Sequence, residues 1–178
     1  LCVALAFLNG SQAPPAEGWD FIPGERTILL DDFSDIPKGA APPHWKVRGG
    51  SVRMDTAGRL SANAKSQLTP NVAGWPKNFT IETEFVPTKV DNGDLNWWFE
   101  QSPGDWLVRL EITLDATQAC AVELIGEGSL GKRDCVYQEG KPNQLNLWFQ
   151  EGRVRVYLNG ERLIDVNQVD LSKMKYGF

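Results

Sequence analysis

Alternating apolar and polar side chains near the C-terminus predict three consecutive β-strands. The runs 144–150, 153–158 and 161–166 each alternate with the two-residue period of a half-buried strand. Glu151-Gly152 and Asn159-Gly160 separate them. Asn-Gly between alternating runs is the strongest short-range hairpin signal, because both central residues of a type I′ turn need a positive φ. The segment therefore predicts an antiparallel meander with one buried and one solvated face.

Similar short segments run through most of the chain, and helical periodicity is nearly absent. Turns rich in Gly, Pro and Asn separate the segments, which is typical of an all-β sandwich or barrel. The fold class that we predict is an all-β, two-sheet antiparallel β-sandwich of the jelly-roll kind. The expected strands are 27–31, 44–47, 51–54, 59–62, 79–86, 95–100, 106–115, 119–125, 134–138, 145–150, 153–158 and 162–166, with a further strand interrupted at 175–178.

The N-terminal residues 1–8 form an apolar run that is too short to span a bilayer and is followed by small and polar residues. This pattern is typical of the apolar part of a secretory signal peptide. We expect residues 1–13 to be a partial signal peptide, 14–26 a linker and lead-in, and 27–178 one β-sandwich domain truncated at its C-terminus. A disordered or buried N-terminal segment remains the alternative, because Pro14 directly follows the candidate cleavage site at Ser11-Gln12-Ala13. A signal peptide predicts a secreted protein of the periplasm, outer membrane or cell surface.

Removal of such a signal leaves an even pair of cysteines, Cys120 and Cys135. A hairpin that turns at Glu127-Gly128 places them opposite each other, so we expect a cross-strand disulfide. Two free thiols in a cytosolic protein are the alternative.

The sequence predicts no metal site and no cofactor. Two cysteines and the single His44 cannot fill a tetrahedral zinc shell without other ligands. The segment 91–94, Asp-Asn-Gly-Asp, has oxygen ligands that suit calcium, but these residue types also make tight turns, and we expect a turn here.

The net charge and the length of the apolar runs limit the kinds of partner that the protein can bind. The net charge of −5, without clustered Lys or Arg, excludes nucleic acid and an anionic membrane surface, both of which require a basic patch. No later apolar run has the length of a transmembrane segment, so no membrane insertion of the mature domain is expected.

Several structural motifs resemble those of a known superfamily. They are the segments 19–25 (WDFIPGE), 30–34 (LDDFS), 37–39 (PxG), 43–45 (PxW) and 156–163 (VYLNGERL). Together they resemble a concanavalin A-like (lectin/glucanase, laminin G-like) jelly-roll domain. More narrowly, they are similar to the N-terminal β-sandwich domains of secreted bacterial envelope proteins that continue into a peptidoglycan-binding domain of the outer-membrane-protein-A type. None of these motifs is a catalytic signature.

The superfamily contains glycoside hydrolases and keto-disaccharide hydrolase-like domains, so this resemblance implies hydrolysis as an alternative. Laminarinase-type members resemble one another in a Glu-x-Asp-x-(x)-Glu strand, which this sequence lacks. Glu82 and Glu84 have no Asp between them, and Glu111 is four residues from Asp115. We expect Glu82 and Glu84 to lie on the solvated face of a half-buried strand. An enzyme would instead bring two carboxylates together in one groove, either Glu82 with Glu84 or Glu111 with Glu100.

Strand alternation also sorts the aromatic residues by face. It places Trp98 on the outer face together with Asn96 and Glu100. Arg109 and Glu111 share the outer face of the next strand, and Trp148 and Tyr157 also point outward. Trp106 is expected in the core. Exposed aromatic rings beside amides and charges suit a pyranose, whose apolar face stacks on the ring while its hydroxyls form hydrogen bonds. The predicted ligand-binding residues are therefore Asn96, Trp98, Glu100, Arg109, Glu111, Trp148 and Tyr157. Burial of these rings by loops or by a neighbouring domain is the alternative.

These observations predict a secreted, non-catalytic module of the cell envelope that binds a glycan or an envelope protein. A glycoside hydrolase or keto-disaccharide hydrolase-like enzyme is the second hypothesis. A purely structural spacer is the third.

Overall fold

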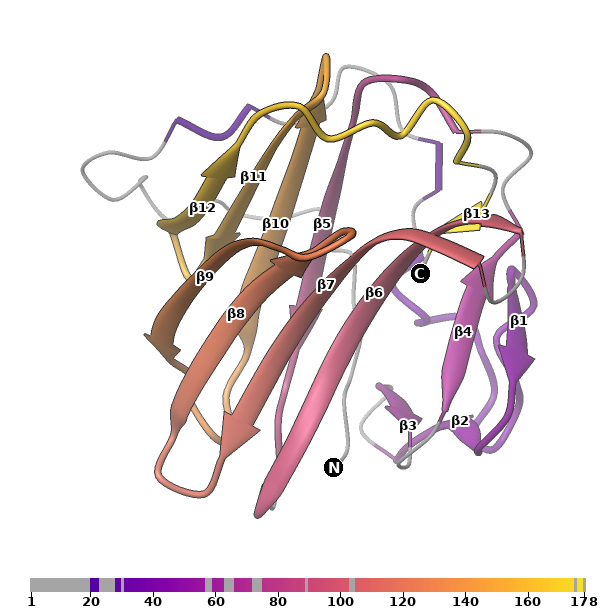
Figure 1. Cartoon of the computed structure of the whole chain (residues 1–178). Coiled ribbons are helices and arrows are strands. Elements are labelled where there is room, and N and C mark those ends of the chain that lie inside the picture. The colour runs from indigo at the N-terminus through magenta and orange to yellow at the C-terminus, as the bar shows by residue number, and fades with distance from the viewer. Residues whose placement is uncertain are drawn as a thin grey trace.

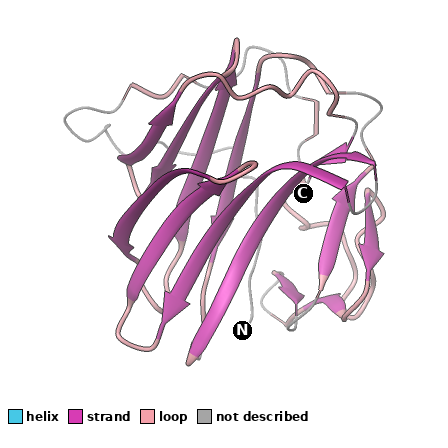
Figure 2. Cartoon of the chain, viewed as in Figure 1, coloured by secondary structure: helices cyan, strands magenta, loops and turns pink. Residues whose placement is uncertain are grey.

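The computed structural model describes residues 20–22, 28–29, 31–56, 59–62, 66–71, 75–88, 90–102 and 105–174, and the backbone of 176–177. Every regular element in these residues is a β-strand (Figure 2). No part of them forms a helix long and apolar enough to cross a membrane. The predicted all-β class is confirmed.

Two antiparallel sheets face each other and form the body of the molecule (Figure 1). The front sheet has the strand order β13-β6-β7-β8-β9, and the back sheet has the order β12-β11-β10-β5. The front strands are β6 (Asn92–Ser102), β7 (Asp105–Asp115), β8 (Ala119–Ile125), β9 (Ser129–Val136) and β13 (Tyr176–Gly177). The back strands are β5 (Phe79–Phe85), β10 (Asn143–Gln150), β11 (Arg153–Leu158) and β12 (Glu161–Val166).

Two small sheets, β1 (Trp45–Arg48) with β4 (Gln67–Pro70) and β2 (Val52–Met54) with β3 (Leu60–Ala62), lie beside this sandwich. They enclose a separate apolar cluster around Phe33, Trp45 and Leu60. The indole N–H of Trp45 donates a 2.8 Å hydrogen bond to the buried Asp31 carboxylate. This bond satisfies the polar end of a buried tryptophan and anchors the chain ahead of β1.

The main core fills the space between the front and back sheets. Alternate residues of each strand point inward, as in β10, where Leu145, Leu147 and Phe149 are buried. Phe149 stacks on Phe79 of the neighbouring strand at 4.4 Å and meets Phe99 of the front sheet at 4.8 Å between ring centroids. Each such buried side chain contributes roughly 1.5–3 kcal/mol, so this apolar layer holds the two sheets together.

The predicted hairpins of the meander are confirmed. Glu151, Gly152, Asn159 and Gly160 all have φ between 49° and 87°, as turns of the primed kind require. Residues 176–177 form a short strand against β6, as the pattern at 175–178 predicts.

Other boundaries differ from the prediction. The described residues of 27–31 are not in a strand, β4 was not predicted, and β9 begins at Ser129 rather than at 134. The tight turn expected at 91–94 is wrong, because Asn92, Gly93 and Asp94 begin β6 and pair with Asp115, Leu114 and Thr113. Pairing with the long strand β7 outweighs the turn preference of these residues.

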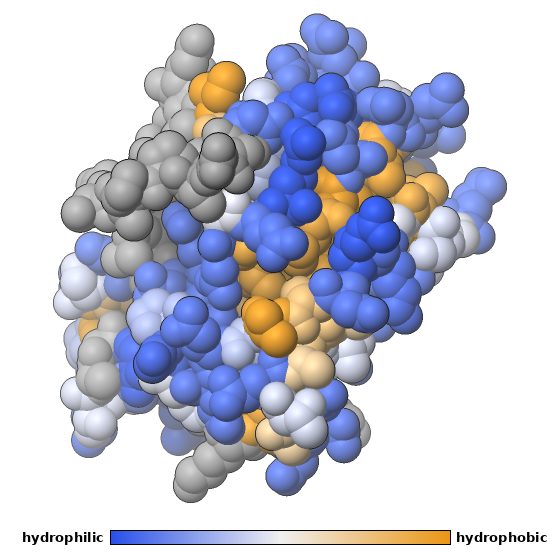
Figure 3. All heavy atoms as spheres, turned by 90° about the vertical axis from the view of Figure 1, so that its left-hand side faces the viewer, coloured by the Kyte–Doolittle hydropathy of each residue, from blue (hydrophilic) through white to orange (hydrophobic). Residues whose placement is uncertain are grey.

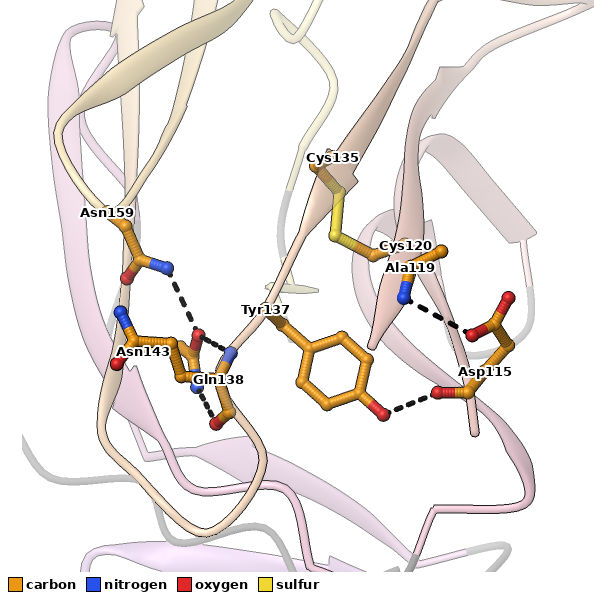
Figure 4. Close-up of a disulfide and its surroundings, with 8 residues drawn as sticks. All are labelled: Asp115, Ala119, Cys120, Cys135, Tyr137, Gln138, Asn143 and Asn159. Atoms are coloured by element: carbon orange, nitrogen blue, oxygen red, sulfur yellow. Dashed lines mark hydrogen bonds between the residues drawn. A yellow bond between two sulfur atoms is a disulfide. The ribbon is translucent and has the colours of Figure 1, made fainter. Parts of the chain in front are cut away.

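The hairpin of β8 and β9 carries the predicted disulfide (Figure 4). Cys120 and Cys135 are directly opposite in register, with 4.8 Å between their Cα atoms. Below the bridge, the Tyr137 hydroxyl donates a 2.6 Å hydrogen bond to the carbonyl of Asp115. This bond connects the end of β7 to the chain that leaves β9.

The edge of the sandwich between β9 and β12 brings apolar atoms to the surface (Figure 3). Leu130 and Val136 are exposed there, and a depression of about 180 Å³ is lined by Val136, Leu158 and Leu163 among others. Gly131 lets the two edge strands approach, because a Cβ at this position would lie 3.2 Å from Ile164 Cγ2.

Replacing both Cys120 and Cys135 by alanine is expected to lower the free energy of unfolding by about 3 kcal/mol, because the bridge closes a loop with a sequence separation of 15 residues. Urea unfolding of the oxidised protein and of the double variant measures the difference. The reduced wild-type protein is the control and should match the variant. Equal unfolding midpoints for oxidised and reduced protein would contradict the prediction.

Candidate functional site

The outer face of the front sheet gathers five of the predicted ligand-binding residues. Strand pairing places Trp98 of β6 opposite Arg109 of β7, and Asn96 opposite Glu111. Glu100 lies on the same face, but it is buried rather than exposed. Residues that share a face at directly opposite positions have their Cβ atoms about 4.5–5.5 Å apart, so these side chains form one continuous surface.

A β-bulge adds Trp106 to this surface. The register shifts between the pairs Phe99–Val108 and Glu100–Trp106, which leaves Leu107 as an extra residue on β7. Trp106 therefore turns outward and is 37% exposed, and its predicted core position is wrong. The sequence signal for this bulge is the run Trp106-Leu107-Val108, whose three consecutive apolar residues cannot keep a two-residue alternation.

Two tryptophans and one arginine form the centre of the surface. The rings of Trp98 and Trp106 meet edge to face at 73°, with 6.0 Å between their centroids. The Arg109 guanidinium carbon lies 4.9 Å from the Trp98 centroid and 5.7 Å from that of Trp106. Arg109 also pairs with Glu111 at 3.2 Å. We call Asn96, Trp98, Trp106, Arg109 and Glu111 the tryptophan platform; its cation–π contacts hold the rings in place.

A strip of paired charges continues the platform across β8 and β9. Glu123 is the cross-strand partner of Glu111 on one side and of Lys132 on the other. The Lys132 ammonium lies 3.5 Å from the Glu123 carboxylate. A hydrogen bond from the Ser129 hydroxyl, together with Lys132, lowers the pKa of Glu123, so this group is ionised at neutral pH. Glu123 and Lys132 were not predicted as site residues, although alternation in 119–125 puts Glu123 outside.

Trp148 and Tyr157 lie on the opposite side of the molecule, on the outer face of the back sheet. The sandwich core therefore separates them from the tryptophan platform, and the seven predicted residues do not make one site. The sequence could not reveal this split, because it depends on which strands share a sheet.

The chain itself covers these two rings. Phe21 contacts Tyr157 at 5.5 Å and Trp148 at 6.3 Å between ring centroids, both edge to face. The Tyr157 hydroxyl donates a 2.7 Å hydrogen bond to Asp20. Tyr157 is fully buried, so its expected exposure is wrong; burial first, and then the bond to Asp20, raise its pKa to about 12.

The carboxylates considered for catalysis are divided between the two faces. Glu82 and Glu84 stand on β5 in the back sheet, and burial raises the pKa of each. Glu111 is paired with Arg109, and Glu100 lies opposite Trp106 rather than opposite Glu111. The glutamates with raised pKa are thus on the side of the molecule away from the tryptophan platform.

Two hollows of the described structure lie away from the tryptophan platform. Besides the edge depression, a hollow of about 220 Å³ lies between the β10–β11 turn and residues 169–172. Neither of these two hollows is lined by a residue of the platform. Within the described part of the chain, no three His, Cys, Asp or Glu side chains are grouped so that they could hold a metal ion.

Comparison with known proteins identifies the fold. No family model and no curated protein sequence matches the chain. Among solved structures, it is similar to the carbohydrate-binding module CBM66 from Bacillus subtilis, with a TM-score of 0.55 and 16% identity over 75% of this chain and 85% of that one. The chain has the concanavalin A-like lectin/glucanase fold.

Two further solved structures with this fold are similar. The carbohydrate recognition domain of Emp46p, in its potassium-bound form, has a TM-score of 0.56 and 14% identity over 75% of this chain and 77% of that one. SCLam, a non-specific endo-β-1,3(4)-glucanase from family GH16, has a TM-score of 0.62 and 11% identity over 95% of this chain and 83% of that one. At these identities the likeness concerns the fold alone.

The substitution Glu82→Gln is expected to raise the free energy of unfolding at pH 7. Burial raises the pKa of Glu82, so the folded state binds this proton more tightly than the unfolded state does. Wild-type stability is therefore lost as the pH rises through the raised pKa, and the variant escapes that loss. Urea unfolding between pH 3.5 and 8 measures the effect.

The advantage of the variant should shrink as the pH falls below the ordinary glutamate range, where the carboxyl is protonated in both states. Glu127→Gln, in the exposed β8–β9 turn, is the control and should change little at any pH. A variant that is less stable than the wild type at pH 7 would contradict the assignment.

Proposed function

We propose that this protein is a non-catalytic carbohydrate-binding module whose ligand lies on the tryptophan platform. The observation that carries the proposal is the exposed Trp106 ring, which packs against Trp98 and Arg109 on the outer face of the front sheet. A rigid exposed aromatic ring is the usual stacking surface for the apolar face of a pyranose. The similarity to structures described as a carbohydrate-binding module and a carbohydrate recognition domain supports this choice.

Polar groups around the rings suit sugar hydroxyls. Glu111 and Glu123 supply carboxylate acceptors, and Lys132 supplies donors at the edge of the platform. Asn96 Oδ1 and Arg109 Nε are buried without a hydrogen-bond partner in the described structure. Buried polar atoms are nearly always paired, so a ligand or water that reaches these two atoms would relieve an existing cost.

The position of the platform on the outer face of a sheet sets the expected strength of binding. A sheet face buries less of a ligand than an enclosed cavity does, so we expect a Kd of about 10 μM to 1 mM, which corresponds to roughly −4 to −7 kcal/mol. Such a module would bind a polymer better than a single sugar, because neighbouring sugar units add contacts along the strip.

The enzyme alternatives, a glycoside hydrolase or a keto-disaccharide hydrolase-like enzyme, have less support. A retaining glycosidase needs a carboxylic acid that keeps its proton, about 5–5.5 Å from a second carboxylate. On the platform side, the pKa of Glu123 is lowered and Glu111 is held by Arg109. The structural spacer differs from the binding module because it predicts no ligand at all.

We also propose that the module acts outside the cytoplasm, in the cell envelope or as part of an envelope protein of the outer-membrane-protein-A type. The Cys120–Cys135 disulfide supports an oxidising compartment. The apolar N-terminal run of the sequence supports export.

Substituting Trp106→Ala is expected to weaken glycan binding at least tenfold, because it removes the exposed stacking ring. A glycan array identifies the ligand, and titration calorimetry with that ligand gives the Kd values. Val136→Ala, which truncates another exposed apolar side chain of the front sheet, is the control and should bind as the wild type does. Trp148→Ala should also keep binding, since Trp148 lies on the opposite face.

No binding to any neutral, acidic or amino-sugar polymer of the array would exclude the carbohydrate-binding proposal and favour the spacer. Binding that Trp106→Ala leaves unchanged would place the site elsewhere. Release of reducing sugar from the bound polymer would favour the enzyme.

A further inference from the structure

A second set of side chains with the chemistry of a sugar site lies on the outer face of the back sheet. Asn146 of β10 stands between Glu82 of β5 and Tyr157 of β11, its two cross-strand partners. Trp148 follows on the same face of β10 and has the Arg155 guanidinium 4.4 Å from its ring centroid. An aromatic ring, an amide, a carboxylate and a phenol are therefore grouped on one surface.

This surface is covered although it carries polar groups. Asn146 is only 1% exposed, yet its Oδ1 atom has no hydrogen-bond partner in the described structure. Glu82 beside it is partly buried, and this burial raises its pKa. A cover that served only stability would bury apolar side chains, since an unpaired buried acceptor and a desolvated carboxylate both oppose folding. The unpaired Asn146 acceptor is what a ligand rich in hydroxyl groups would satisfy.

The cover includes residues 20 and 21, which lie outside the strands of the back sheet. Phe21 is 6% exposed and packs on Tyr157 and Trp148. Asp20 accepts a 2.7 Å hydrogen bond from the Tyr157 hydroxyl and a 2.7 Å bond from Arg162. The pairing of β5, β10, β11 and β12 involves neither residue, so the sheet does not need them for its backbone hydrogen bonds.

We infer that Asp20 and Phe21 close over a second ligand site on the back sheet, formed by Glu82, Asn146, Trp148 and Tyr157, which takes a neutral pyranoside when the segment moves away. Sugar hydroxyls donate to Asn146 Oδ1 and to the Glu82 carboxylate, and the sugar ring packs where Phe21 packs now. Tyr157 exchanges its bond to Asp20 for one to the ligand. A uronic acid is disfavoured, because its carboxylate would face Glu82.

This site is independent of the tryptophan platform, because the two lie on opposite faces of the sandwich. Its test therefore uses the Trp106→Ala background, in which the platform is removed. In that background we compare the closed protein with the double variant Asp20→Ala/Phe21→Ala. Ile22→Ala is the matched control, since Ile22 belongs to the same segment but is 63% exposed.

Binding is measured by affinity electrophoresis with laminarin, xylan, galactomannan and hydroxyethyl cellulose as neutral probes, and with polygalacturonate as the acidic one. The double variant is expected to bind at least one neutral polymer at least tenfold more tightly than its Trp106→Ala parent, and Ile22→Ala no more tightly than the parent. Adding Asn146→Leu, which keeps the branching of the side chain and removes the acceptor, should abolish the gain. No gain on any neutral polymer, or a gain that survives Asn146→Leu, would overturn the proposal. Stronger binding to polygalacturonate alone would also overturn it.

A second readout does not depend on the choice of polymer. Carboxyl carbon NMR of Glu82 should show its pKa falling toward the ordinary glutamate value in the double variant, and staying raised in Ile22→Ala. An unchanged Glu82 pKa in the double variant would show that these residues do not cover the site. Melting temperatures establish that each variant is folded. If the double variant does not fold, Arg162→Ala, which removes the ion pair with Asp20 and a 3.7 Å contact with Asp165, should give a smaller change in the same direction, and no change would overturn the proposal.

Discussion

The two large sheets are held together because each buries its apolar face against the other. Phe79, Phe99 and Phe149 meet in the middle of the sandwich, and alternate residues of every long strand follow them inward. Because successive side chains point to opposite faces, fixing the inner set also fixes the outer one. The two outer faces are therefore the places where this fold can present polar and aromatic groups to a ligand.

Local departures from alternation give these faces their chemistry. One extra residue in β7, Leu107, turns Trp106 out of the core and places it against Trp98 and Arg109. Without that bulge the front face would present one tryptophan fewer, and the Arg109 guanidinium would lose one of its two aromatic neighbours. A site can thus arise from a single register shift in a strand that otherwise serves the core.

The two outer faces differ in access rather than in composition. Each combines tryptophan, arginine, asparagine and glutamate, but the front face presents the exposed Trp106 ring whereas Phe21 and Asp20 cover the back face. Burial on the back face raises the pKa of Glu82. The exposure of one aromatic ring, not the kind of residue, therefore distinguishes the two faces.

The sequence alone determined the all-β class, the hairpins at 151–152 and 159–160, the pairing of Cys120 with Cys135, and which face of β6 carries Asn96 and Trp98. These features follow from local rules, namely the two-residue period, the positive φ of turn residues and the position of a hairpin turn. Contacts between distant segments decided the rest: that β6 begins within the expected turn at 91–94, that Trp106 is exposed, and that Trp148 lies on the opposite sheet from Trp98. No local pattern encodes them, because strand partners, bulges and covering segments are selected by the packing of the whole sandwich.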